Sequence, residues 1–388
     1  MNTPRRGLPR RIAKTWRHLR QGIRTPQGPL GRSLHPLWRW GRATWGRLRG
    51  TGGFGEPSTM VAFYDLGEWP ITYDFIWFLV AADMARADAG LEHLHVVFVP
   101  GVDWGRGNED KAYFAVIDGP ARRQRLYDIL LPATALMPAI RGVTIAGSRG
   151  EASRLLDGCA GRSFPAGYSP ELPHLDYYWF SNFVSDAARA GRPVPNVEAP
   201  PGARRWVENW RAAHGGDRPL VVITVRFFGW NEVRNSNLDA WAAFAREIEG
   251  QGFRAVFVPD THTTLDAPHP ALAGQTLFVE AAWHVQLRMA LYEAAYLNLA
   301  VNTGPIVLCR LNRGCRYIIF KLAIEELRIA SLEAQRLRGI DPRDPSPLLA
   351  PFHKLVLEAD DLPVIRREFE AMRRLIEADA APVAVPLP

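Results

Sequence analysis

Cysteine and long apolar runs are both scarce in this sequence. There are three cysteines in 388 residues; Cys159 stands alone, and Cys309 and Cys315 are too widely spaced for the usual paired thiolates of a zinc site. This excludes a disulfide scaffold and favours buried, reduced thiols in a cytosolic protein. The longest strongly apolar run, 75–82, is far shorter than the ~20 residues that span a bilayer.

Common catalytic signatures are also missing. The sequence contains no GxxxxGK[ST] phosphate loop, no HExxH, no GxGxxG and no clear Asp-x-Asp metal motif. His93 and His95 flank the start of an expected strand, and we interpret them as structural residues and not as metal ligands. We therefore expect no metal and no tightly bound cofactor.

Acidic residues are absent from the first 50 positions, which carry 13 Lys and Arg, and Glu56 is the first acid. Of 47 basic residues in total, 34 therefore remain in the body of the chain, against 40 acidic ones, a net charge of −6 there. The overall charge of +7 thus comes from the tail. A basic globular nucleic-acid binder would carry its positive patch on the folded domain, so nucleic acid is not an expected partner.

The tail, residues 1–50, combines arginine with tryptophan. Ile12, Trp16, Leu19 and Ile23 share one face of a helix, and a second stretch mixes Trp and Arg with poorer periodicity. This combination suits an anionic bilayer surface, and predicts a cytoplasmic protein attached peripherally to the inner face of the cytoplasmic membrane. A disordered extension, contact of the tail with nucleic acid or another partner, and an organellar transit peptide remain alternatives.

The body reads as two α/β halves, 51–200 and 201–360. Each alternates continuous apolar runs, typical of buried parallel strands, with helical segments. In the first half, strands are expected at 60–66 and 94–101 around a helix at 73–88. The expected elements of the second half are strands at 219–227 and 253–260 and a helix at 238–249. A Pro-rich linker at 190–203 separates the halves, which predicts two Rossmann-like domains facing a cleft.

In open α/β sheets, ligands bind beyond the carboxyl ends of the strands, so the residues after each strand are the first candidates. Arg226 and Arg234 are suited to hold a diphosphate, because a guanidinium can donate two hydrogen bonds to phosphate oxygens. Asn235 is placed to orient a sugar, although nearby asparagines could equally cap the next helix. Asp260 could accept a hydrogen bond from a ribose or could cap a turn.

The segment Asn302-Thr303-Gly304-Pro305 follows another apolar strand and opens a helix. Glycine lets a ligand approach the backbone, and the N–H groups of a helix start attract an anion.

In the first half, Glu68 and Asp74 follow the strand 60–66, and either carboxylate could remove a proton from an attacking hydroxyl. A carboxylate early in a helix is also favourable for its dipole alone.

Together these motifs resemble the GT-B glycosyltransferases over roughly residues 58–380. NTGPIVL (302–308) is similar to the Asp-Thr-Gly-Pro-Met-His-Leu loop of the heptosyltransferase family, with Asn302 in place of the acid and Val307 in place of His. Gly67-Glu68 is similar to that family's Gly-Asp, whose acid is the proposed base. ITVR (223–226) also resembles the strand-Arg motif of fucosyltransferases.

The resemblance implies a transferase that uses a nucleotide-diphosphate sugar without a metal and acts on a polysaccharide or glycolipid acceptor. It also implies that the amphipathic helix at 361–378, within the segment 361–388, crosses back to the first domain. A non-catalytic relative that binds glycans or assembly partners, and a nucleotide-sugar epimerase of the same architecture, remain alternatives.

Removal of residues 1–50 tests the role of the tail. If the Trp and Arg side chains hold the protein on anionic lipid, the shortened protein will no longer sediment with vesicles containing anionic phospholipid, while the full chain will. Nucleotide binding by the body should not change. Sedimentation that persists without the tail would contradict the membrane assignment.

Overall fold

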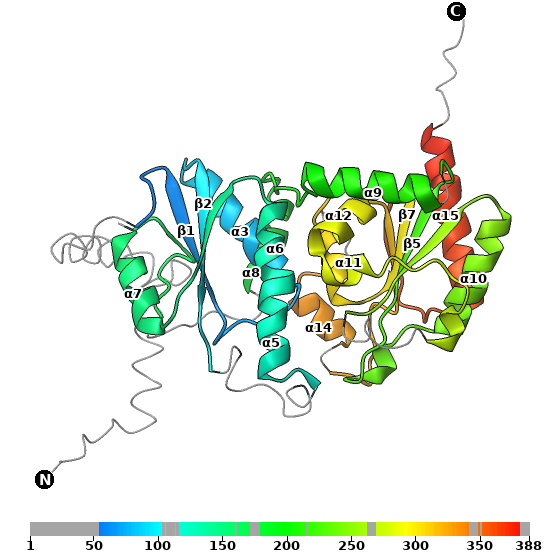
Figure 1. Ribbon diagram of the computed structural model, residues 1–388, viewed down its shortest axis with the longest axis horizontal. Coiled ribbons are helices and arrows are strands. Elements are labelled where there is room, and N and C mark those ends of the chain that lie inside the picture. Colours follow the sequence, from blue (N-terminus) through cyan, green and yellow to red (C-terminus); the bar gives the residue numbers. More distant parts are fainter. Residues whose placement is uncertain are drawn as a thin grey trace, which may run out of the picture. The chain divides into compact units, whose positions relative to one another are not determined.

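The computed structural model (Figure 1) describes residues 54–102, 105, 113, 116–159, 161–170, 179–214, 216–261, 269–328, 330–340, 348–349 and 351–380. The tail at 1–50, and with it the predicted membrane-binding segment, lies outside the described residues. The chain divides into two compact units, each made of three segments. The first unit comprises Met1–Pro70, Ala82–Glu109 and Pro138–Tyr177, and the second comprises Ile71–Ala81, Asp110–Met137 and Tyr178–Pro388.

The first unit contains a four-stranded sheet in the order β3-β2-β1-β4, and every pair of neighbouring strands is parallel. Its strands are β1 (Thr59–Asp65), β2 (His93–Val99), β3 (Ile140–Ile145) and β4 (Ser163–Phe164). Every residue of β1 is buried, as expected of a parallel strand with both faces covered. The continuous apolar run of the sequence therefore corresponds to the centre of this sheet.

One face of the first sheet packs against α7 (Arg149–Gly158). Ser148 caps this helix, because its hydroxyl accepts a hydrogen bond from the amide of Glu151 at 3.1 Å. Alternate residues of β1 and β2 meet Ala152 and Leu156 in a shared apolar core. The helix α3 (Phe75–Asp88) follows β1 and is divided between the two units at Ala81.

The second unit contains a five-stranded sheet in the order β6-β5-β7-β8-β9, again parallel throughout. Its strands are β5 (Leu220–Thr224), β6 (Arg254–Val258), β7 (Leu297–Val301), β8 (Tyr317–Phe320) and β9 (His353–Leu355). Two α/β units with parallel sheets confirm the predicted fold class. The cleft between them stays a prediction.

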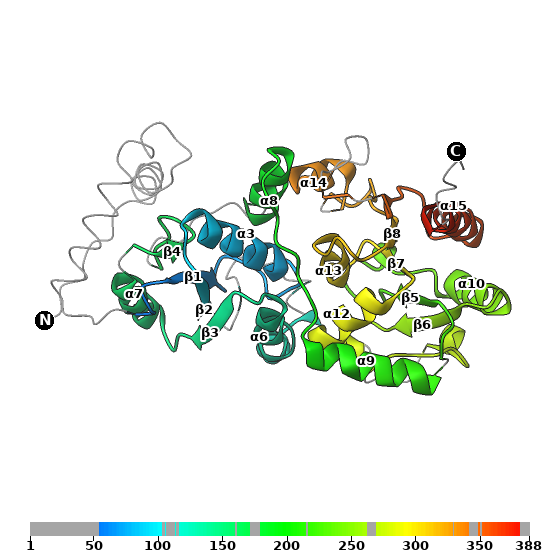
Figure 2. The ribbon, with the colours of Figure 1, turned by 90° about the horizontal axis from the view of Figure 1, so that it is seen from above.

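Helices cover both faces of the second sheet. Figure 2 shows α10 (Leu238–Gly250) and α15 (Leu362–Ala380) on one side of the strands, and α12 (Val285–Ala294) and α13 (Val307–Arg310) on the other. The side chains of the strands alternate accordingly. Ile223 and Leu299 join the core under α10 and α15, whereas Thr224 bonds to Tyr292 of α12.

The remaining helices are short or lie outside these two layers. They are α5 (Gly119–Arg125), α6 (Leu131–Ala133), α8 (Trp179–Arg189), α9 (Pro201–His214), α11 (Glu280–Trp283) and α14 (Leu332–Leu337). Single turns of other helix types occur at Leu126–Leu130, Thr134–Leu136, Glu232–Arg234, Pro270–Leu272 and Gly304–Ile306. No helix in the described part of the chain is long and apolar enough to span a membrane.

The helix α15 packs its apolar face on the second unit. The helix forms where the sequence predicts it, and its buried residues Ile365, Phe369 and Met372 belong to the core of the second unit. Phe369 packs edge-on against Phe244 of α10, with ring centroids 5.1 Å apart. The apolar face of α15 completes the core on the second sheet. That this helix crosses back to the first domain stays a prediction.

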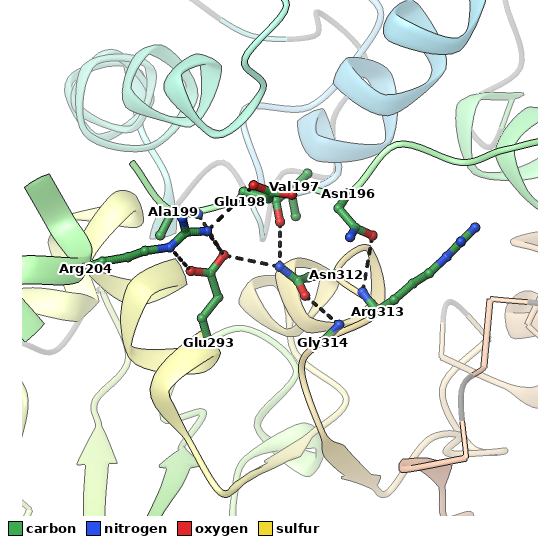
Figure 3. Close-up of polar contacts among 9 residues, drawn as sticks. All are labelled: Asn196, Val197, Glu198, Ala199, Arg204, Glu293, Asn312, Arg313 and Gly314. Atoms are coloured by element: carbon green, nitrogen blue, oxygen red, sulfur yellow. Dashed lines mark hydrogen bonds and ion pairs between the residues drawn. The ribbon is translucent and has the colours of Figure 1, made fainter. Parts of the chain in front are cut away.

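The second half of the Pro-rich linker is fixed to the second unit through Glu293 (Figure 3). The carboxylate of Glu293, in the last turn of α12, accepts hydrogen bonds from the Ala199 amide at 2.9 Å and from Nε of Arg204 at 2.6 Å. Nδ2 of Asn312 donates to the Val197 carbonyl at 2.8 Å and to the same carboxylate at 3.3 Å. One carboxylate thus satisfies donors from the linker, α9 and the residues after α13.

Replacement of Glu293 by alanine should destabilise the protein more than loss of an ordinary surface charge. Several half-buried donors would lose their acceptor, so we expect the free energy of unfolding to fall by about 2–4 kcal/mol. Glu249→Ala is the matched control, because Glu249 forms a single 3.4 Å pair with Arg254, a pair worth at most about 1 kcal/mol. Denaturant unfolding measures both variants, and equal losses would contradict the role of Glu293.

Candidate functional site

The carboxyl ends of the second unit's strands form the candidate site. All the strands of this sheet are parallel, so the residues that follow them meet at one edge. Arg226 comes shortly after β5, Asp260 after β6, Asn302 after β7 and Lys321 after β8. Three of these four residues were predicted from the sequence, and Lys321 was not.

Arg226 is buried, with 4% of its surface exposed, and its guanidinium holds the following loop. Nη2 donates to the Trp230 carbonyl at 2.6 Å, and Nη1 donates to the Asn231 carbonyl at 3.3 Å and to Oδ1 of Asn235. Burial lowers the pKa of Arg226, and the charge of Asp260 opposes that shift. The predicted diphosphate ligand is therefore also the residue that braces the loop 227–235.

Asn235 has the same bracing function in the structure. Its side-chain amide donates to the Phe228 carbonyl and accepts from the Phe228 amide, both at 3.1 Å. Its own carbonyl accepts a hydrogen bond from Nζ of Lys321 at 2.8 Å, and Nζ also lies 2.8 Å from a carboxylate oxygen of Asp360. Lys321 has a positive φ of 49°, a conformation that its sequence position did not indicate. Orientation of a sugar by Asn235 stays a prediction.

Arg234 joins the loop after β5 to the loop after β7. Its Nη2 donates to the carbonyl of Asn302 at 2.9 Å, while Nδ2 of Asn302 donates to the Leu322 carbonyl at 2.8 Å. The structure thus brings Arg234 to the Asn302 segment, which lies 68 residues further along the sequence. Arg234 is only partly buried, so an anion at this edge could reach it.

The predicted helix start at Gly304 is one turn of 3-10 helix, Gly304–Ile306, followed by the short helix α13. Thr303 has an extended backbone and precedes that turn. Pro305 is the second residue of the turn. Gly304 is exposed, and a Cβ added to it would lie 3.4 Å from Cδ2 of Tyr73. The aromatic ring of Tyr73 therefore borders this loop, a contact that the sequence did not predict.

A second buried arginine, Arg288, lies near the same edge. Burial acts to lower its pKa, but the electrostatic effects of Tyr73, Tyr292 and Asp260 outweigh burial, and the pKa is raised. Its Cζ lies 5.8 Å from the centroid of the Tyr73 ring. Asp260 therefore acts electrostatically on both Arg226 and Arg288. Sequence analysis missed Arg288 because it occurs within a helical segment and not after a strand.

The two candidate bases belong to different units. Glu68 is in the first unit, in the turn after β1, where it adds to the negative charge around Arg149. Asp65, the last residue of β1, is fully buried and bonded to both terminal nitrogens of Arg149, at 2.8 and 2.7 Å. Asp74 belongs to the second unit, is exposed, and accepts a 3.3 Å hydrogen bond from Oγ1 of Thr72.

No family model and no curated protein matches this sequence. Several solved structures are similar to the chain. A family 9 glycosyltransferase from Veillonella parvula DSM 2008 has 12% identity and a TM-score of 0.49, covering 85% of this chain and 98% of that chain. The E. coli ADP-heptose lps heptosyltransferase II has 9% identity and a TM-score of 0.42, covering 83% and 99%.

The E. coli heptosyltransferase WaaC, solved with ADP-2-deoxy-2-fluoro heptose, has 11% identity and a TM-score of 0.37, covering 80% of this chain and 99% of that chain. The family that the Asn302-Thr303-Gly304-Pro305 loop resembles is thus represented among the solved structures similar to this chain.

Loss of the Arg226 guanidinium should loosen the loop that it braces. In Arg226→Met, three loop acceptors lose their donor, so amide hydrogen exchange in 227–235 should accelerate by about tenfold or more. Exchange in β5 should change little. Arg246→Met, at an exposed position of α10, is the control. Unchanged exchange in the loop of Arg226→Met would contradict the bracing function.

Proposed function

We propose that this protein is a glycosyltransferase of the GT-B type. It transfers a sugar from a nucleotide-diphosphate donor to a polysaccharide or glycolipid acceptor, without a metal ion, at the inner face of the cytoplasmic membrane. The donor binds at the carboxyl edge of the second sheet. The observation that carries the proposal is the hydrogen bond between Arg234 and the Asn302 carbonyl. It joins the basic loop after β5 to the glycine-containing loop after β7.

Both loops offer groups suited to a diphosphate. Arg234 supplies a partly exposed guanidinium, and exposed Gly304 leaves the backbone around Thr303 open to close approach. When the bond between the sugar and the diphosphate breaks, negative charge grows on the leaving oxygen. Hydrogen-bond donors fixed at that place before the reaction stabilise the transition state. Arg226 keeps the loop in position and adds positive charge.

Asp260 follows the adjacent strand β6 and is placed to accept a hydrogen bond from the nucleoside, as acidic residues do in nucleotide-binding α/β folds. Asp74 is the favoured base for an inverting reaction, because it is exposed and belongs to the same unit as the donor loops. A base must accept the proton of the attacking acceptor hydroxyl as the new glycosidic bond forms. Glu68 is the alternative base.

A panel of UDP, GDP, ADP and CMP tests donor binding directly. At 100 times its dissociation constant, a bound nucleotide stabilises the native state by about 2.7 kcal/mol, so one member of the panel should raise the melting temperature measurably. Arg234→Ala should weaken that nucleotide about 10- to 100-fold through loss of a charged hydrogen bond. Arg246→Ala should bind normally. A panel without any stabilising nucleotide would overturn the proposed function.

A further inference from the structure

Arg288 lies in the interior of the second unit, on a helix that is otherwise largely apolar. It occupies the first half of α12, with 1% of its surface exposed, among the buried residues Val285, Met289 and Tyr292. Nε donates to the Ala281 carbonyl at 2.7 Å, and Nη1 donates to the Tyr292 hydroxyl at 3.2 Å. Nη2 is buried and has no hydrogen-bond partner among the described residues.

Among the described residues, no anion contacts this buried positive charge. No carboxylate of the described residues forms an ion pair with Arg288, and Asp260 acts on it only electrostatically. A buried charge is costly unless it is paired, and an unmade hydrogen bond adds to that cost. By contrast, the buried Asp65 of the first unit is closely paired with Arg149. The guanidinium of Arg288 is therefore complementary to an anion that the described residues do not provide.

Neighbouring groups fix the guanidinium without neutralising it. The Tyr292 hydroxyl bonds to Oγ1 of Thr224, the last residue of β5, at 2.8 Å, which ties Arg288 to the carboxyl edge of the sheet. Burial raises the pKa of Tyr292 to about 12, so this phenol stays neutral near pH 7. Arg288 thus keeps its full charge and a fixed orientation close to the loops of the candidate site.

Tyr73 covers this charge. Its ring lies over the guanidinium, with the centroid 5.8 Å from Cζ, and the same residue packs against exposed Gly304. Tyr73 is itself buried, with 6% of its surface exposed. The aromatic side chain therefore touches both the buried cation and the loop in which the diphosphate is proposed to bind.

We propose that Arg288 binds the diphosphate of the donor, and that Tyr73 closes over Arg288 in the free protein and turns away when the donor enters. This inference rests on the proposed function, because it names a further ligand of the same diphosphate. Nη2 then donates to a phosphate oxygen, in a site where little water competes for the bond. Arg226 holds the loop 227–235 in position, while the buried guanidinium of Arg288 contacts the diphosphate as it leaves the sugar.

Calorimetric titration of the full chain tests the inference. The probes are UDP, GDP and ADP, each compared with its nucleoside. Arg288→Met keeps the length of the side chain but removes its charge, and should weaken the nucleoside diphosphate that the wild type binds by about 10- to 100-fold. Affinity for the matching nucleoside should stay within about twofold of the wild-type value, because only the phosphate contact is lost. Arg204→Met is the control. Arg204 belongs to α9 and contacts Glu293, which lies on the same helix as Arg288.

The possible failures are distinguishable. A wild-type protein that binds neither these three nucleotides nor CMP overturns the proposed function, and the inference with it. A wild-type protein that binds CMP alone overturns only the inference. A wild-type protein that binds one of the three nucleotides, together with an equally tight Arg288→Met variant, overturns only the inference. A general loss of affinity, extending to the nucleoside, would indicate a structural role for Arg288 and would also overturn it.

A second variant keeps Arg288 and removes its cover, which decides the matter if Arg288→Met does not fold. In Tyr73→Ala, phenylglyoxal should modify Arg288, and the nucleoside diphosphate should protect it, whereas the nucleoside should not. Tyr73→Phe retains the ring and should leave Arg288 unreactive. An Arg288 that stays unreactive in Tyr73→Ala, or that the nucleotide does not protect, would overturn the inference.

Discussion

Burial of arginine at the carboxyl edge of the second sheet is the constraint on which the candidate site depends. A guanidinium removed from water must find acceptors, and for Arg226 those acceptors are the carbonyls and the amide of its own following loop. The loop is thereby fixed, and it presents Arg234 to the Asn302 carbonyl. The conformation of the loop at the site thus follows from the hydrogen bonds that one buried guanidinium requires.

The first unit solves the same problem differently. Asp65 at the end of β1 is fully buried, and it is bonded to Arg149 and to the Tyr168 hydroxyl, at 2.7 Å in the latter case. There the partly exposed Arg149 neutralises the buried carboxylate, and the pair ties the end of β1 to α7. At the edge of the second sheet, Arg288 has no such partner among the described residues. A carboxylate paired with an arginine is suited to a structural role. A buried arginine without an acceptor for one of its nitrogens is suited to bind an anionic ligand.

Much of the fold could be predicted because buried parallel strands read as continuous apolar runs. Arg226 and the Asn302 segment could be predicted as candidates because ligands of open α/β sheets bind beyond the carboxyl ends of the strands. Arg288 was not predicted, although a spacing of three from Val285 and four from Tyr292 places it on the buried face of its helix. Tyr73 could not be found, since its contact with Gly304 links distant parts of the sequence. For α15, the apolar face predicted a helix but not its packing partner.

Each unit is assembled from three separate stretches of chain, and this has an evolutionary consequence. Ile71–Ala81 and Asp110–Met137 lie early in the sequence but belong to the second unit. There Trp77 packs against Arg310, and the Pro132 carbonyl accepts a hydrogen bond from Gln286. A gene fusion or exchange made at the proline-rich linker would separate these segments from the surfaces that they cover. The two halves of the sequence are therefore not interchangeable parts, and an exchange that keeps the second unit whole must carry both early segments with it.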